Sequence, residues 1–81
     1  MIFVLKKKYI KNGLEAFEIV SINKKIINSK SDARRLIRGG AVKFNGKLIK
    51  DELEKISEKN LSNNKIEVSI GKKNHFTIRI I

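Results

Sequence analysis

The sequence predicts an α+β domain with two packed helices, a β-hairpin and a small, mostly antiparallel sheet closed by the C-terminal strands. Three observations predict this fold. Apolar residues recur at helical spacing after Gly13, a second helix signal ends at Gly39-Gly40, and two later stretches alternate apolar and polar residues around turn sequences. The chain has 81 residues, which is enough for one domain with a modest core.

Residues 1–12 are predicted to be an extended lead-in or linker, and residues 13–81 the domain itself. Ile2 and Val4 could pair as a strand, but we expect Lys6-Lys7-Lys8 to be a solvated tether. A helix is predicted over about residues 14–23, because apolar side chains there follow the helical period. The stripe consists of Gly13, Ala16, Phe17 and Val20.

The second helix has the clearest boundaries. Ser31 suits the N-cap because its hydroxyl can accept a hydrogen bond from a first-turn N–H, and Asp32 follows where the helix dipole favours an acid. Gly39-Gly40 can adopt the left-handed conformation that ends a helix. Helical periodicity groups Ala33, Leu36 and Ile37 on one face and puts three arginines on the opposite face: Arg34, Arg35 and Arg38.

Two hairpins are predicted after this helix. Residues 41–44 alternate and Asn45-Gly46 is a strong turn signal, although Leu48 and Ile49 compete for the inward face of the return strand. Residues 66–70 and 76–80 alternate around a turn at Gly71-Lys72-Lys73-Asn74. Between the hairpins, the acidic stretch 51–64 predicts a short turn or half-buried helix followed by a loop. We expect it to lie away from any bound phosphate, because like charges repel.

Several classes of function are disfavoured by composition. There is no cysteine, so disulfides and thiolate metal sites are excluded. The sequence holds no apolar run of membrane-spanning length and no signal-peptide pattern, which favours a cytoplasmic location. His75 is the single histidine and lacks companion ligands, so we expect neither a metal site nor a catalytic residue. Phe17, Phe44 and Phe76 are predicted to pack in the core rather than stack on bases.

Positive charge is concentrated in the middle of the chain. Residues 24–50 contain nine Lys or Arg and one acid, Asp32, which gives +8 of the formal +11. We expect no nearby acid to neutralise the three arginines, so their mutual repulsion is relieved by a partner. Because the guanidinium fork matches phosphate, this predicts a nucleic-acid partner. A membrane surface or an acidic protein is the alternative, but the apolar face of the helix is narrow and needed by the core.

The same residues resemble a known RNA-binding module. Ser29-Lys30-Ser31-Asp32-Ala33-Arg34-Arg35-Leu36-Ile37, followed by Gly40-Ala41-Val42-Lys43-Phe44-Asn45-Gly46-Lys47, is similar to the helix–hairpin signature of the ribosomal small-subunit protein four family. The doubled arginine, Asp51 and Ile70-Gly71-Lys72-Lys73 resemble one class within it, the C-terminal domains of bacterial tyrosyl-tRNA synthetases. The resemblance covers about residues 13–80.

This resemblance implies the αL RNA-binding motif and binding of tRNA-Tyr at its variable arm and anticodon stem. The RNA-binding residues that we expect are Lys30, Ser31, Arg34, Arg35, Arg38, Lys43, Asn45 and Lys47, with Lys24, Lys25, Lys72 and Lys73 as secondary contacts. The chain itself is expected to need no cofactor and to catalyse nothing.

The resemblance also implies a parent enzyme. That enzyme would be a homodimeric tyrosine–tRNA ligase that uses ATP and tyrosine, with its own catalytic domain beside this one. Two other carriers of the module stay open as alternatives at this point. They are a stand-alone ribosome-associated RNA-binding protein and the RNA-targeting domain of a pseudouridine synthase.

Overall fold

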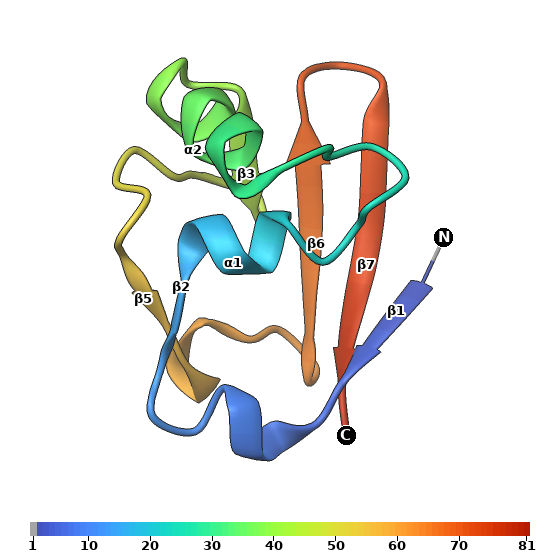
Figure 1. Cartoon of the computed structure of the whole chain (residues 1–81). Helices are drawn as coiled ribbons and strands as arrows, with labels where there is room; N and C mark the ends of the chain where they lie inside the picture. Colours follow the sequence, from blue (N-terminus) through green and yellow to red (C-terminus); the bar gives the residue numbers. More distant parts are fainter. Residues whose placement is uncertain (1) are drawn as a thin grey trace.

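A five-stranded mixed sheet supports two helices that pack on one of its faces (Figure 1). The computed structural model describes residues 2–81. The strands of this sheet are β1 (Ile2–Leu5), β3 (Val42–Phe44), β4 (Lys47–Leu48), β6 (Lys65–Ile70) and β7 (Asn74–Ile80). Their order across the sheet is β1-β7-β6-β3-β4; β1 runs parallel to β7, and the other neighbours are antiparallel.

The remaining elements lie around the helices. They are the helices α1 (Ala16–Val20) and α2 (Lys30–Arg38), the 3₁₀ turns η1 (Lys7–Tyr9) and η2 (Glu58–Asn60), and the strands β2 (Leu14–Glu15) and β5 (Lys55–Ile56). β2 and β5 form a separate antiparallel pair. The predicted class, α+β with two helices and a mostly antiparallel sheet, is confirmed. In the acidic stretch 51–64, the predicted short turn is present at residues 52–53, whereas strand β5 and the turn η2 are additional to the prediction.

The C-terminal hairpin follows the predicted alternation. Ile66 pairs with Ile78 and Val68 with Phe76, and all four side chains are buried. Residues between them point to the open face of the sheet, as the two-residue period of a strand requires. Gly71 opens the turn with φ of 66°, a left-handed conformation that glycine adopts without steric cost.

The N-terminal lead-in is part of the packed domain and not a free tether. Residues 2–5 form the edge strand β1, which pairs with residues 77–80. The Lys7 N–H donates to the carbonyl of Ile81 at 2.8 Å, and Ile10 is fully buried. The lysine run is exposed, as expected, but Lys7 and Lys8 form part of the turn η1, because burying Ile10 brings the chain back onto the core.

Helix α1 is shorter than the predicted range 14–23. Residues 14 and 15 are held extended by pairing with β5, so the helix begins only at Ala16. The Ala16 N–H donates to the carbonyl of Glu54 at 2.9 Å, which satisfies a first-turn donor outside the helix. At the other end, the Ser21 hydroxyl donates to the Phe17 carbonyl, and the chain turns away.

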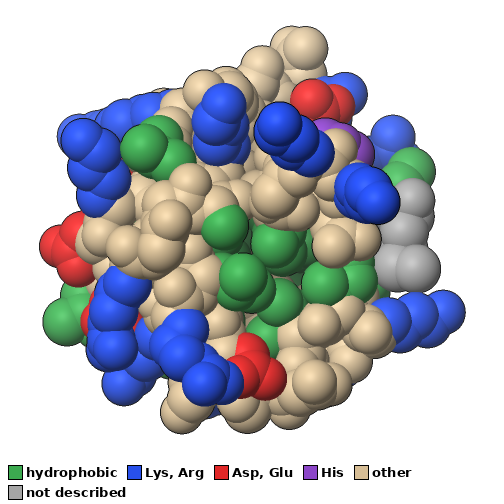
Figure 2. Space-filling model, turned by 90° about the horizontal axis from the view of Figure 1, so that it is seen from above, with side chains coloured by type: hydrophobic (Ala, Val, Ile, Leu, Met, Phe, Trp, Pro, Cys, Tyr) green, Lys and Arg blue, Asp and Glu red, His purple; other side chains and the backbone are tan. Residues whose placement is uncertain are grey.

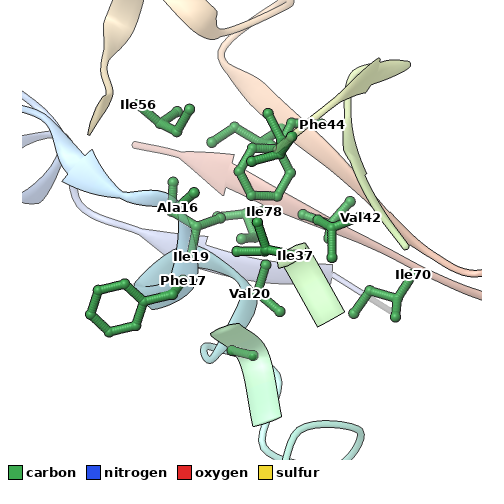
Figure 3. Close-up of a cluster of buried hydrophobic side chains, with 14 of the residues drawn as sticks. Ala16, Phe17, Ile19, Val20, Ile37, Val42, Phe44, Ile56, Ile70 and Ile78 are labelled. Atoms are coloured by element: carbon green, nitrogen blue, oxygen red, sulfur yellow. The ribbon is translucent and has the colours of Figure 1, made fainter. Parts of the chain in front are cut away.

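The core lies between the helices and the sheet. Figure 3 shows Ile37 from α2, Ile19 and Val20 from α1, and Val42 and Ile78 from the sheet in one cluster, and all five are fully buried. Burying one such side chain stabilises the fold by about 1.5–3 kcal/mol. This packing fixes the rotation of α2 and therefore decides which of its side chains reach solvent.

The first hairpin has the predicted turn, and the structure shows which residue of its return strand faces the core. Asn45 and Gly46 both have positive φ, 51° and 84°, as a tight two-residue hairpin turn requires. Ile49 is buried while Leu48 is exposed. The Ile49 N–H donates to the Val42 carbonyl at 3.0 Å, which keeps the return strand against β3.

Candidate nucleic-acid interface

Helix α2 is capped by Ser29 and not by the predicted Ser31. Ser29 has an extended backbone, and its hydroxyl accepts a hydrogen bond from the Asp32 N–H at 3.2 Å. The spacing of Ser29 and Asp32, a hydroxyl followed three residues later by an acid, is a helix-start signal in the sequence. At the other end Gly39 is the C-cap, and Gly40 takes the left-handed conformation with φ of 76°.

The arginines of α2 share one exposed face, as predicted. Ala33 and Ile37 are buried, while the side chains of Arg34, Arg35 and Arg38 are 43%, 70% and 61% exposed. Together with Ser31, the three arginines line a shallow, mainly polar hollow of about 320 Å³. We call this the arginine hollow. Guanidinium groups that line one hollow offer several N–H donors, which suits an anion with several acceptor oxygens.

Glu52 neutralises part of this face, contrary to the expectation that no acid would do so. One of its oxygens, Oε1, lies 2.8 Å from both Nε and a terminal nitrogen of Arg38. The other oxygen lies 3.3 Å from Nε of Arg34 in an ion pair, and both atoms are shielded from solvent and form no hydrogen bond. The acidic stretch was expected to lie away from the phosphate site. The fold instead brings Glu52 against it, because the chain leaving the first hairpin crosses beside α1 and α2.

The Phe17 ring packs against the guanidinium of Arg34. The side chain of Phe17 is buried as predicted and lies at the edge of the core cluster in Figure 3. The Arg34 guanidinium sits 4.2 Å from the centre of the Phe17 ring. Such a cation–π contact is worth about 0.5–2 kcal/mol, depending on exposure. The sequence predicts core packing for Phe17, and its apolar stripe carries no signal for this second contact.

Two further basic side chains of α2 have acidic neighbours. Arg35 forms an ion pair with Asp32 one turn earlier on the helix. Lys30 lies with its Nζ 3.8 Å from a carboxylate oxygen of Glu18 in α1. Both basic side chains are about two-thirds exposed, so these pairs contribute little to stability and the charges stay accessible to a partner.

The hairpin residues do not all join the arginine hollow. Lys43 points to the open face of the sheet, because its neighbours Val42 and Phe44 fill the core on the opposite side. Lys47 pairs with Phe44 across the hairpin and lies 4.0 Å from Glu54. The Asn45 side chain is occupied within the protein: it donates to the Asn60 carbonyl at 3.1 Å and accepts from the Glu67 N–H at 2.8 Å.

The four secondary lysines lie on exposed turns. Lys24 and Lys25 follow Asn23, whose side chain accepts from the Lys25 N–H at 3.1 Å. Lys72 and Lys73 lie in the β6–β7 turn, which the Gly71 N–H ties to the Ala41 carbonyl just after α2. Seen from this end, Lys and Arg side chains gather around a hollow that exposes apolar atoms (Figure 2). A hollow at the start of α2 is lined by Ile26, Ile27 and Leu36, beside Asp32 and Arg35.

A candidate metal site is not found within residues 2–81. In that range, no three His, Asp or Glu side chains are grouped closely enough to hold a metal ion. His75 contacts the Ser69 hydroxyl at 3.1 Å on the open face of the sheet. Across the same residues, the structure has no helix with the length and apolar character needed to cross a membrane.

The fold and this surface define a small α+β domain whose distinguishing feature is an exposed arginine face on one short helix. Comparison with known families identifies it more closely. The model of the tyrosine–tRNA ligase SYY-like C-terminal domain matches residues 6–78. The chain therefore belongs to this family of C-terminal domains, in agreement with the resemblance carried by the helix–hairpin motif.

Individual relatives agree with the family match. The chain is 35% identical to the tyrosine–tRNA ligase of Pelagibacter ubique over 77 residues and 35% identical to that of Rickettsia prowazekii over 79 residues. It is 41% identical to the tyrosine–tRNA ligase of Rickettsia bellii over 78 residues. These alignments cover 95–96% of the chain but 19% of each relative. The chain thus spans about a fifth of the length of the curated relatives it matches.

Proposed function

We propose that this domain binds transfer RNA as the C-terminal domain of a tyrosine–tRNA ligase. The observation that carries the proposal is the arginine hollow, in which Arg34, Arg35 and Arg38 converge with Ser31 in a chain of this family. Transfer RNA is the substrate named in the relatives' activity. A cluster of arginines at one exposed point is suited to neighbouring phosphates of a folded RNA.

The binding mode that we propose is recognition of RNA shape at the variable arm and anticodon stem of tRNA-Tyr. The three arginines contact phosphates of one strand, and Lys30 and Ser31 lie at the start of α2, where the helix dipole favours an anion. Side chains cannot read the narrow major groove of A-form RNA, so phosphate and ribose contacts dominate. The helix and hairpin would together act as an αL motif of the ribosomal protein four type.

The parent enzyme is part of the same proposal. A catalytic domain elsewhere in the full-length protein would use ATP and tyrosine, whereas this domain would contribute RNA binding alone and hold no cofactor. The enzyme would act as a homodimer in the cytoplasm. Its C-terminal domain would then raise the affinity for tRNA without touching the reacting atoms.

The test compares two RNA transcripts at physiological salt. One is a tRNA-Tyr transcript with its long variable arm, and the other is the same transcript with that arm deleted. We expect the deletion to weaken binding at least tenfold, about 1.4 kcal/mol. Equal binding would show a general RNA binder and would favour the stand-alone ribosome-associated protein or the pseudouridine synthase domain.

A further inference from the structure

Glu52 occupies a fixed position between the two helices. Its main-chain carbonyl accepts a hydrogen bond from the Phe17 N–H at 3.1 Å, and the next turn is closed by the Leu53 N–H donating to Asp51 Oδ1 at 2.9 Å. Two residues later, the Glu54 carbonyl accepts from the Ala16 N–H. The backbone of residues 51–54 is therefore tied to the start of α1, and the Glu52 side chain is only 17% exposed.

From this position, one carboxylate restrains two arginines of α2. Arg38 is held by a hydrogen bond from Nε and by close contact of one terminal nitrogen with the same oxygen, whereas Arg34 forms an ion pair at 3.3 Å without a hydrogen bond. The Phe17 ring lies under the Arg34 guanidinium as a second restraint. Because a guanidinium carries N–H donors on all its nitrogens, each arginine keeps donors that Glu52 does not use. Those donors belong to the same side chains that line the arginine hollow.

We propose that Glu52 is a positioning residue for phosphate binding, which holds Arg34 and Arg38 in the conformation that receives the RNA backbone. This inference rests on the proposed function. Glu52 is an acidic residue outside the helix–hairpin motif, and this inference gives it a favourable role in binding a polyanion. The carboxylate fixes two long side chains before the RNA arrives, so the ordering that binding would otherwise require is already complete.

The opposite role, in which Glu52 masks the arginines, makes a different prediction. Removing the charge of Glu52 would by itself strengthen attraction to a phosphate, and partial burial of the carboxylate enlarges that gain. Immobilising two flexible side chains on binding instead weakens affinity by about five- to 100-fold. The two roles therefore predict opposite signs: loss of Glu52 should weaken RNA binding if Glu52 positions the arginines, and strengthen it if Glu52 masks them.

Three variants separate the two roles. Glu52→Gln removes the charge and the charge-assisted contacts, and Glu52→Asp keeps the charge but is too short to span both arginines. Glu54→Gln is the matched control, because Glu54 belongs to the same acidic segment and lies 4.0 Å from Lys47 rather than near an arginine. Binding is measured with the tRNA-Tyr transcript at several salt concentrations, and thermal unfolding confirms that each variant is folded.

We expect Glu52→Gln and Glu52→Asp each to weaken binding about tenfold, and Glu54→Gln to change it less than threefold. The slope of log affinity against log salt should stay that of the unmodified protein, because the same phosphates are neutralised. The Nε–H signals of Arg34 and Arg38 in NMR spectra of the free domain should lose their dispersion in both Glu52 variants and keep it in Glu54→Gln.

Other outcomes would overturn specific claims. If Glu52→Gln bound RNA as tightly as Glu54→Gln or more tightly, Glu52 would be a mask and the positioning role would be wrong. If Glu52→Asp bound like the unmodified protein, charge and not reach would be what matters, which also overturns positioning. Failure of the unmodified domain to bind either transcript would instead overturn the proposed function.

Discussion

Helix α2 and the β3–β4 hairpin both carry exposed positive charge, but they hold it in different ways. On α2, Arg34 and Arg38 are restrained by Glu52, and Arg34 also by Phe17. On the hairpin, Lys43 points to the open face of the sheet and Lys47 has a distant acidic neighbour at 4.0 Å. The sequence gives both regions a similar charge, whereas the fold restrains the side chains of one of them.

The two regions differ in how much side-chain freedom is lost when RNA binds. A restrained guanidinium loses little freedom when it meets a phosphate, whereas a solvated lysine must be ordered at that moment. Charge density alone would rank the two regions almost equally. Side-chain restraint ranks α2 well above the hairpin, and the following variants test that ranking.

The largest effect should come from removing two charges from each region in turn. We expect Arg34→Gln with Arg38→Gln to weaken tRNA binding about 50-fold or more, because charge-assisted hydrogen bonds are the strong ones. Lys43→Gln with Lys47→Gln makes the same change in net charge, and we expect a loss of about fivefold or less. Equal losses, measured by fluorescence anisotropy with one transcript, would show that charge density and not restraint decides affinity.

Arg34→Lys keeps the charge but removes the planar fork that lies over Phe17 and faces Glu52. We expect about tenfold weaker tRNA binding, because a lysine ammonium is a flexible point charge. The comparison variant is Lys47→Arg, which should leave affinity within about twofold. Unchanged binding by Arg34→Lys would contradict a specific role for the guanidinium geometry.

Phe17→Leu tests the aromatic support alone. We expect about threefold weaker RNA binding together with a loss of about 1 kcal/mol in the free energy of unfolding. Phe44→Leu is a suitable control, because Phe44 is equally buried but belongs to β3. It should lower stability by a similar amount in chemical denaturation and leave affinity unchanged. A matching loss of affinity in the control would assign the effect to stability.

The smallest expected effect separates the two serines at the start of α2. Ser29→Ala should lower the free energy of unfolding by about 1 kcal/mol, because the hydroxyl caps the Asp32 N–H. Ser31→Ala should change stability by less than about 0.5 kcal/mol, as expected for a surface position in the first turn. The opposite order in urea denaturation would place the cap at Ser31.

Secondary structure could be predicted from the sequence where a local pattern of residues determines it. The turn at Asn45-Gly46, the strands 66–70 and 76–80, and the arginine face of α2 follow from spacing and turn chemistry. The late start of α1 and the partner of strand β1 were not predicted, because both depend on residues far along the chain: Glu54 for the start of α1, and β7 for β1. Local propensity cannot reveal such pairing.

The candidate site divides in the same way. The arginines could be predicted because they are neighbours on one helix. The sequence does not predict Glu52 and Phe17 as parts of the site, because their contacts form only after folding. Glu52 lies 14 positions from Arg38 in the sequence, and Phe17 lies 17 positions from Arg34. Asn45 stays a predicted RNA contact, and its side chain also joins the hairpin to Asn60 and Glu67 within the protein.

The most direct test of the central claim is the salt dependence of tRNA binding by the unmodified domain. If the arginine face of α2 and its neighbours neutralise about five phosphates, log affinity should fall against log salt with a slope of about −3.5 to −4.5. Arg34→Gln with Arg38→Gln should make that slope shallower by about 1.4–1.8. A slope near zero in the unmodified domain would contradict binding to the RNA backbone through this surface.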